Sequence, residues 1–240
     1  FGVETMAIWL FASMSLACLS AIFGLKPDPV SAPRPGEGFR ARLKEALRLF
    51  RRPTFAIPVA AASLIQCSHA FYYGFGSLVW ARQGMGDDVI GWLWGVGVAV
   101  EVALLWSLPR FERRFSPEVL IAIGGAGGLL RWTAMAFSPP LALLWPLQSL
   151  HALSFAAAHV GALRLVQREA PEHIAGVAQT LYAALASGTV AGLAALLAGA
   201  LYDQVGAHGY LGMAVLSGAG LAVLVWRGGL RGVGVGATPA

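Results

Sequence analysis

The chain has 240 residues, of which 12% are charged and 57% are hydrophobic, and its mean hydropathy is +0.67. Soluble domains carry roughly 25% charged residues, so this composition argues against a soluble enzyme and against a disordered chain. The net charge of +5 does not indicate a nucleic acid as partner, because the basic residues alternate with long apolar stretches instead of forming one face. A membrane protein is the better interpretation.

Seven stretches are apolar and long enough for transmembrane helices, since about 20 residues cross the roughly 30 Å of hydrocarbon in a bilayer. We expect spans at about 3–25, 54–81, 89–109, 118–137, 141–165, 174–202 and 209–227. The first stretch carries Glu4 where a secretory signal would carry Lys or Arg. We therefore interpret it as a real span, in a chain whose natural start is missing.

The basic residues indicate which side each loop occupies. Fifteen of the 17 Lys and Arg residues lie in the segment 26–53, in the loops near 110–114 and 164–168, and in the C-terminal tail. The alternate loops carry only Arg82. Short loops rich in Lys and Arg stay in the cytoplasm, so we expect the 26–53 linker and the C-terminus to be cytoplasmic.

We therefore expect an all-α membrane protein in four parts. Residues 1–25 are the last helix of an incomplete N-terminal bundle, and 26–53 form a cytoplasmic linker. Residues 54–227 form a six-helix transmembrane bundle, and 228–240 form a cytoplasmic tail.

The linker begins with a Pro-rich segment and continues with an amphipathic pattern. One face of the predicted helix carries Phe39, Leu43, Leu47 and Phe50 among basic residues. Such a helix is suited to an anionic membrane surface. A solvated basic connector is the alternative.

Glycines recur at four-residue spacing within the expected spans, which lets helix backbones approach closely in lipid. Gly is common in membrane helices in any case. The pairs are Gly91 with Gly95, Gly124 with Gly128, and Gly188 with Gly192.

Several polar residues lie inside the expected spans, where a charge near the helix centre costs about 2.5 to 3.5 kcal/mol. A rise of about 1.5 Å per residue places four ionisable groups from four helices in one layer near the bilayer centre: His69, Glu101, Arg131 and His151. The same spans also contain Gln66, Gln148 and His159.

A facing Glu101 and Arg131 would offset each other's burial cost. A static ion pair is one interpretation. Because imidazole changes charge near neutral pH, a set of Glu101, Arg131 and His151 also fits a proton relay coupled to solute binding.

The neighbouring side chains suggest where a solute would bind. Tyr72, Tyr73 and Phe155 are suited to walling a flat or ring-containing molecule, although lipid-facing aromatic residues are common. The candidate solute-binding residues are Gln66, His69, Tyr72, Tyr73, Arg131, Gln148 and Phe155. No pair of His residues has metal-ligand spacing, so we expect neither a metal nor a cofactor.

Five segments together carry a resemblance to a known family: HAFYYGFGSLVW (69–80), IGWLWGVGVAVE (90–101), LLRW (129–132), LQSLHALSFAAAH (147–159) and GALYDQVGAHGY (199–210). With these segments the sequence resembles the major facilitator superfamily, in the C-terminal half of the branch that holds phenylpropionate, lactose and nucleoside symporters.

The resemblance implies a twelve-helix carrier with a binding site at the bilayer centre between two six-helix halves. Glu101, Arg131 and His151 then look like the acid, the base and the histidine that couple protons to sugar transport. The sequence departs from that pattern in one place, because Ser154 and Phe155 follow His151 where the pattern has a second acid.

We therefore expect a transporter and not an enzyme: a proton-coupled importer of a small organic solute such as an aromatic carboxylate, with Arg131 as the anion partner. The alternatives are a permease-like sensor or binding component, and a symporter for a neutral sugar or nucleoside. The expected setting is a bacterial inner membrane, where the chain works with a missing six-helix half and is a monomer when full length.

Overall fold

The computed structural model describes residues 38–111 and 114–226, together with isolated positions between 12 and 23. The chain forms two compact units, Phe1–Pro35 and Gly36–Ala240. Most of the span expected at 3–25 and all of the tail expected at 228–240 lie outside the described residues.

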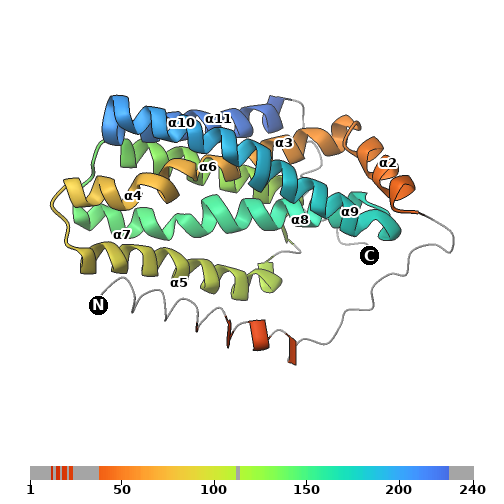
Figure 1. The fold of residues 1–240 in the computed structure, drawn as a ribbon, viewed down its shortest axis with the longest axis horizontal. Helices are drawn as coiled ribbons and strands as arrows, with labels where there is room; N and C mark the ends of the chain where they lie inside the picture. The colour runs from red at the N-terminus through yellow and green to blue at the C-terminus, as the bar shows by residue number, and fades with distance from the viewer. Residues whose placement is uncertain are drawn as a thin grey trace. The chain divides into compact units, whose positions relative to one another are not determined.

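The described part of the second unit consists of helices and contains no strand, which confirms the all-α fold class (Figure 1). The α-helices are α2 (Phe39–Leu49), α3 (Pro53–Cys67), α4 (Ala70–Arg82), α5 (Asp87–Phe111), α6 (Pro117–Ala136), α7 (Leu141–Ser149), α8 (Ala158–Glu169), α9 (Glu172–Ala183), α10 (Val190–Val205) and α11 (Tyr210–Trp226). The segments η2 (Ala152–Ala157) and η3 (Ala184–Thr189) are π-helical, and η4 (Gly206–Gly209) is a 3-10 turn.

Five helical runs in the described residues are long and apolar enough to span a membrane: Pro53–Arg82, Asp87–Leu108, Pro117–Ala136, Leu141–Glu169 and Glu172–Trp226. The last run has 55 residues and is divided by η4. Gly206 begins this turn with a φ of +56°, a left-handed backbone that glycine adopts without strain. The turn separates α10 from α11, so the run accounts for two of the expected spans.

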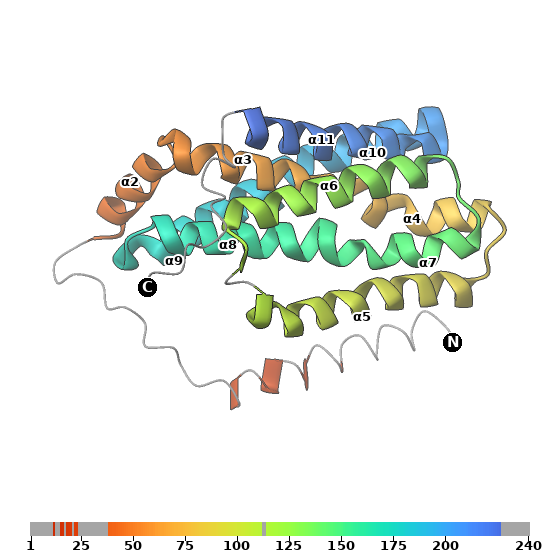
Figure 2. The same ribbon diagram turned by 180° about the vertical axis from the view of Figure 1, so that it is seen from behind.

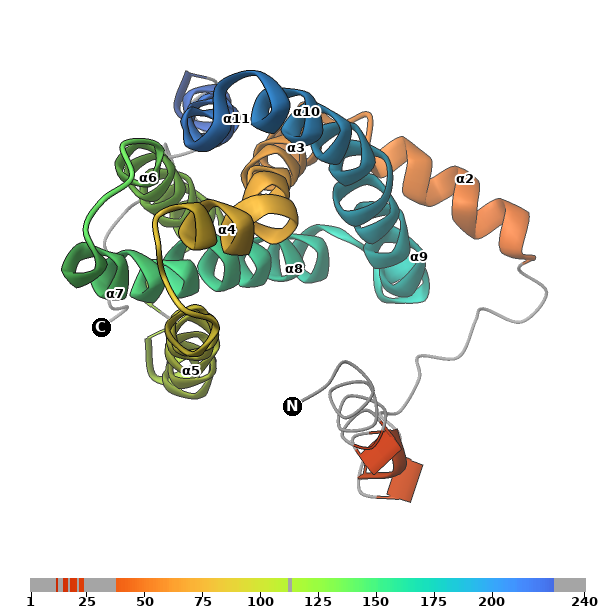
Figure 3. The same ribbon diagram turned by 60° about the vertical axis from the view of Figure 1, so that its left-hand side comes forward.

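The helices are arranged around α3 and α4. Figure 2 shows α5 along one edge of the second unit, with α7 and α8 beside it, and α6 and α11 towards the opposite edge. In Figure 3, which looks more nearly along the helices, α3 and α4 lie between α6 and α10. This arrangement brings polar residues of α3, α6 and α7 to the interior.

Three spans that we expected to be regular are interrupted at one level of the bundle. Ser68 and His69 separate α3 from α4, η2 follows His151, and η3 separates α9 from α10. Side chains bond the backbone at the first break, where the Ser68 hydroxyl donates to the Ile65 carbonyl at 2.6 Å. Such bonds compete with helix hydrogen bonds, and π segments occur often at functional sites.

The interior consists of two apolar clusters with a layer of buried polar residues between them. One cluster includes Ile65, Ile121, Ala158, Ala186 and Leu224. The other includes Phe71, Trp132, Leu147, Ala198 and Met213. The polar layer is formed by Ser68, His69, Arg131, Gln148, His151, Ser154 and Ser217. Each helix that contributes to the layer crosses from one apolar cluster to the other.

Helix α2 lies where an amphipathic helix was expected, and part of the face that we expected on a membrane surface is exposed in the described structure. Ala46 and Leu49 are buried, whereas Phe39 and Leu47 are 61% and 46% exposed. The buried face packs on α9, and His173 on that helix lies 3.0 Å from a carboxylate oxygen of Glu45. The contact with α9 therefore involves the side of α2 that carries Glu45, Ala46 and Leu49.

Only one of the three glycine pairs packs closely. A Cβ atom on Gly124 of α6 would lie 2.6 Å from the Cβ of Ala158 on α8, and one on Gly128 would meet Ser217 of α11. The other four glycines have no atom within 4 Å of such a Cβ among the described residues: Gly91, Gly95, Gly188 and Gly192. The glycine pattern alone did not distinguish these cases.

We predict that Gly124→Ala lowers the stability of the bundle by about 1 to 3 kcal/mol, because the added methyl overpacks the contact between α6 and α8. Gly95→Ala is the matched control, since it adds the same methyl in open space and removes backbone freedom worth about 0.5 to 1 kcal/mol. Thermal unfolding in detergent measures both variants. Equal midpoints for the two variants would contradict the packing assigned to Gly124.

Candidate coupling site

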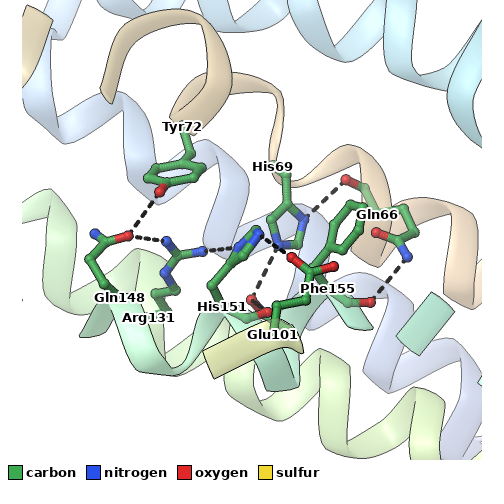
Figure 4. A network of polar contacts seen from close by, with 9 residues as sticks. Gln66, His69, Tyr72, Glu101, Arg131, Gln148, His151 and Phe155 are labelled. Atoms are coloured by element: carbon green, nitrogen blue, oxygen red, sulfur yellow. Dashed lines mark hydrogen bonds and ion pairs between the residues drawn. The ribbon is translucent and has the colours of Figure 1, made fainter. Parts of the chain in front are cut away.

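The polar layer is centred on Arg131, which α6 places in the interior with no exposed surface. One terminal nitrogen donates to Oε1 of Gln148 at 2.8 Å, and the other lies 3.0 Å from Nδ1 of His151 (Figure 4). The guanidinium carbon also lies 4.4 Å from the ring centroids of both Tyr72 and Trp132. The charge is therefore held by two hydrogen bonds and two aromatic faces.

These contacts fix the tautomer of His151. An arginine can only donate hydrogen bonds, so Nδ1 of His151 accepts from Arg131. The proton of the neutral imidazole is then on Nε2, which lies 3.5 Å from Oε2 of Glu101. The side chain of Glu101 is 20% exposed, whereas that of His151 is 6% exposed. One proton-bearing ring therefore joins a partly accessible acid to a buried cation.

The direct pair that we expected between Glu101 and Arg131 is not present. The two side chains form no ion pair in the described structure, and His151 lies between them. The physical reason is the helix packing, because α5 packs on α7 and η2, the segments that flank His151. Glu101 therefore reaches the histidine before it reaches the arginine.

Gln148 and Tyr72 complete the network on the far side of Arg131. Oε1 of Gln148 accepts hydrogen bonds from the Tyr72 hydroxyl and from Arg131, both at 2.8 Å. Nε of Arg131 and Nε2 of Gln148 are buried without a partner. Leaving a buried donor without a partner costs about 1 to 3 kcal/mol. These two nitrogen atoms could therefore still donate hydrogen bonds to a further partner.

His69 lies beside the network but bonds differently. Its Nδ1 lies 3.2 Å from the Ile65 carbonyl and 3.1 Å from the Gln66 carbonyl, and since carbonyls only accept, Nδ1 carries the proton. Its Nε2 faces the Ser154 hydroxyl at 3.1 Å. The ring centroid lies 5.5 Å from that of His151. His69 is therefore in ring contact with His151 without a direct hydrogen bond to it.

A cavity of about 330 Å³ lies beside His69, between α3 and α4, the segment from η2 to α8, and the segment from α9 to α10, and is lined by Gln66 and Phe155, which contact His69. Three predicted solute-binding residues line it: Gln66, Tyr73 and Phe155. The predicted solute set is therefore divided, because Tyr72, Arg131 and Gln148 belong to the buried network and do not line this cavity.

Sequence reasoning missed the third wall of the cavity. Gln179, Tyr182 and Ser187 line it from α9 and η3. Gln179 and Tyr182 are three residues apart and share a helix face, and an amide side chain inside an expected transmembrane span is the sequence signal that could have found the wall. His159 also lines the cavity.

Among the residues that the structure describes, no three His, Cys, Asp or Glu side chains are grouped to hold a metal ion.

Comparison with known proteins gives the family. The model of the MFS_1 like family matches residues 3–211. The chain is 28% identical over 206 residues to a probable 3-phenylpropionic acid transporter of Escherichia coli, an alignment that covers 83% of this chain and 52% of the relative. It is 29% identical over 227 residues to a maltose permease of Geobacillus stearothermophilus, which covers 90% of this chain and 55% of the relative.

A putative nucleoside transporter of Escherichia coli is 26% identical over 169 residues, which covers 68% of this chain and 39% of the relative. The chain thus spans about half the length, or less, of these relatives. No solved structure shows a significant match to it. With its apolar spans and the family match, the chain is a multi-pass membrane protein that belongs to the MFS_1 like family, and the relatives above are named as transporters or a permease.

Proposed function

We propose that this protein couples the uptake of a small organic solute to protons. The observation that supports the proposal best is the unbroken series of contacts from Glu101 through His151 to the buried Arg131. The series begins at a partly accessible acid and ends at a cation that cannot lose its charge under ordinary conditions. Protonation of Glu101 therefore changes the charge close to a buried guanidinium group that itself stays charged.

The charge balance of the network links proton binding to a change of state. With Glu101 ionised and His151 neutral, the acid offsets the charge of Arg131. A proton on Glu101 removes that offset, and an uncompensated buried charge costs several kcal/mol. A ligand or a protein state shifts an equilibrium only through such a difference in free energy. We propose that solute binding and helix rearrangement offset this cost, so that proton binding and solute binding depend on each other.

We propose an aromatic acid as the first candidate solute. One relative is named for 3-phenylpropionic acid, and Tyr73 and Phe155 provide ring surfaces at the cavity. Our proposal departs from the expected role of Arg131 as direct anion partner, because the side chain is fully buried and does not line the cavity. We assign Arg131 to coupling instead. A neutral sugar or nucleoside is the second candidate, since relatives are named for such solutes.

We further propose a bacterial inner membrane as the location, with the 26–53 linker and the C-terminus in the cytoplasm. The basic residues in the connections support this orientation. We expect a second six-helix half to complete the carrier, and a monomer as the working form. A permease-like sensor would share the fold but would not need Glu101 to exchange protons.

The coupling role predicts a specific defect in Glu101→Gln. The variant should lose accumulation driven by a proton gradient, because the amide cannot release a proton, while solute exchange between the two sides continues. Uptake of labelled 3-phenylpropionate is measured in proteoliposomes with the full-length protein. Asp203→Asn is the control, since it neutralises an exposed acid at the end of α10. Accumulation at the wild-type level in Glu101→Gln would refute the relay.

The orientation is tested by cysteine labelling in intact cells, with both native cysteines changed to Ser. An impermeant maleimide should modify His208→Cys in the exposed turn η4 and should leave Ala41→Cys in α2 unmodified until the cells are opened. Modification of Ala41→Cys from outside would reverse the assigned orientation.

A further inference from the structure

The cavity beside His69 has no charged wall. None of its lining residues is Lys, Arg, Asp or Glu. Arg131 and Glu101 belong to the polar network and are separate from the lining. A charged solute group in this cavity would therefore meet no permanent opposite charge among the described side chains that line it. His159 is the lining side chain that could become a cation, and beside a neutral His159 a carboxylate would be an isolated charge, whose burial is strongly unfavourable.

The aromatic side chains on one side of the cavity meet at angles that suit a ring. The rings of Phe155 and His159 are stacked, with centroids 6.1 Å apart and planes 15° apart. Tyr73 meets Phe155 edge to face, at 6.4 Å and 87°. Both stacked and edge-to-face contacts stabilise aromatic pairs, and the cavity volume of about 330 Å³ is at the lower end of the range found for small-molecule sites.

Two buried polar groups at the cavity have unused bonding capacity. Nε2 of Gln66 donates to the Phe155 carbonyl at 3.2 Å, which fixes the amide so that Oε1 is an acceptor, and this oxygen is buried without a partner. Tyr182 is only 2% exposed, and its hydroxyl also has no partner. An unpaired buried group costs about 1 to 3 kcal/mol, which a solute with a hydrogen-bond donor would recover.

We infer that this cavity binds a solute with one aromatic ring in an uncharged form, and that the solute donates a hydrogen bond to Gln66. The inference rests on the proposed function and specifies its substrate class. For an aromatic acid, the bound species is the protonated acid: the carboxylate takes up one proton, and the resulting O–H group donates to the amide oxygen. This proton is carried by the solute itself and is separate from the proton that we assign to Glu101.

The chemical class is tested by equilibrium binding of four probes with the same ring to the purified full-length protein. 3-Phenylpropan-1-ol and 3-phenylpropionamide are uncharged and donate hydrogen bonds, methyl 3-phenylpropionate only accepts, and 3-phenylpropionate is an anion at neutral pH. We expect the alcohol and the amide to bind about tenfold more tightly than the ester and the anion, which corresponds to about 1.4 kcal/mol. Tighter binding of the anion, or binding of none of the four, overturns the inference.

The location is tested with two matched pairs of variants. Ala183 lines the cavity and Ala184 does not, and both are exposed on the same helical segment. Ala183→Phe should abolish binding of the alcohol, whereas Ala184→Phe should retain it. Tyr182→Phe should weaken binding, whereas Tyr210→Phe, which removes an unpartnered buried hydroxyl away from the cavity, should not. Equal effects within either pair would place the site elsewhere.

The two proposals fail differently. If Glu101→Gln loses proton-driven accumulation while Ala183→Phe binds the probes normally, the carrier function stands and the cavity assignment is wrong. If the cavity variants behave as expected and the full-length protein shows no accumulation driven by a proton gradient, the binding site stands as that of a sensor, and the inference that protons enter with the solute is wrong.

Discussion

The burial of one positive charge determines how the interior of this bundle is built. Arg131 has no exposed surface, and an arginine cannot escape the cost of burial by releasing its proton. The surrounding helices supply Gln148 as an acceptor, two aromatic faces, and the path through His151 to Glu101. Removing any of these partners leaves part of the buried charge unbalanced.

The polar layer around Arg131 also accounts for the irregular helices. A carbonyl in a regular helix already accepts one hydrogen bond, whereas an interrupted helix leaves carbonyls free to accept from side chains of neighbouring helices. Two consecutive residues of α3 donate hydrogen bonds to such carbonyls. Gln66 donates to the Phe155 carbonyl of η2, and Cys67 donates to the Ala186 carbonyl of η3. The end of α3 is thus tied to both π segments, at the level where the cavity opens.

Much of this structure could be predicted from sequence, because lipid imposes simple rules. Apolar length indicated the spans from residue 54 onwards, and the cost of buried charge singled out Glu101, Arg131 and His151. The order in which they contact each other could not be predicted, since depth along a helix does not say which face a side chain occupies. The interruptions at His69 and Ala184 were missed because neither segment contains a proline that would signal a break in the helix.

The central claim is that Glu101 and Arg131 act as one electrostatic unit through His151, although they do not touch. A double-mutant cycle of Glu101→Gln and Arg131→Gln, measured as free energies of unfolding in mixed micelles, tests it directly. The account predicts a coupling free energy of about 1 to 3 kcal/mol, falling below about 0.5 kcal/mol in a His151→Leu background, where the bridge is absent. Additive effects within about 0.5 kcal/mol in the native background, the behaviour of independent sites, would contradict it.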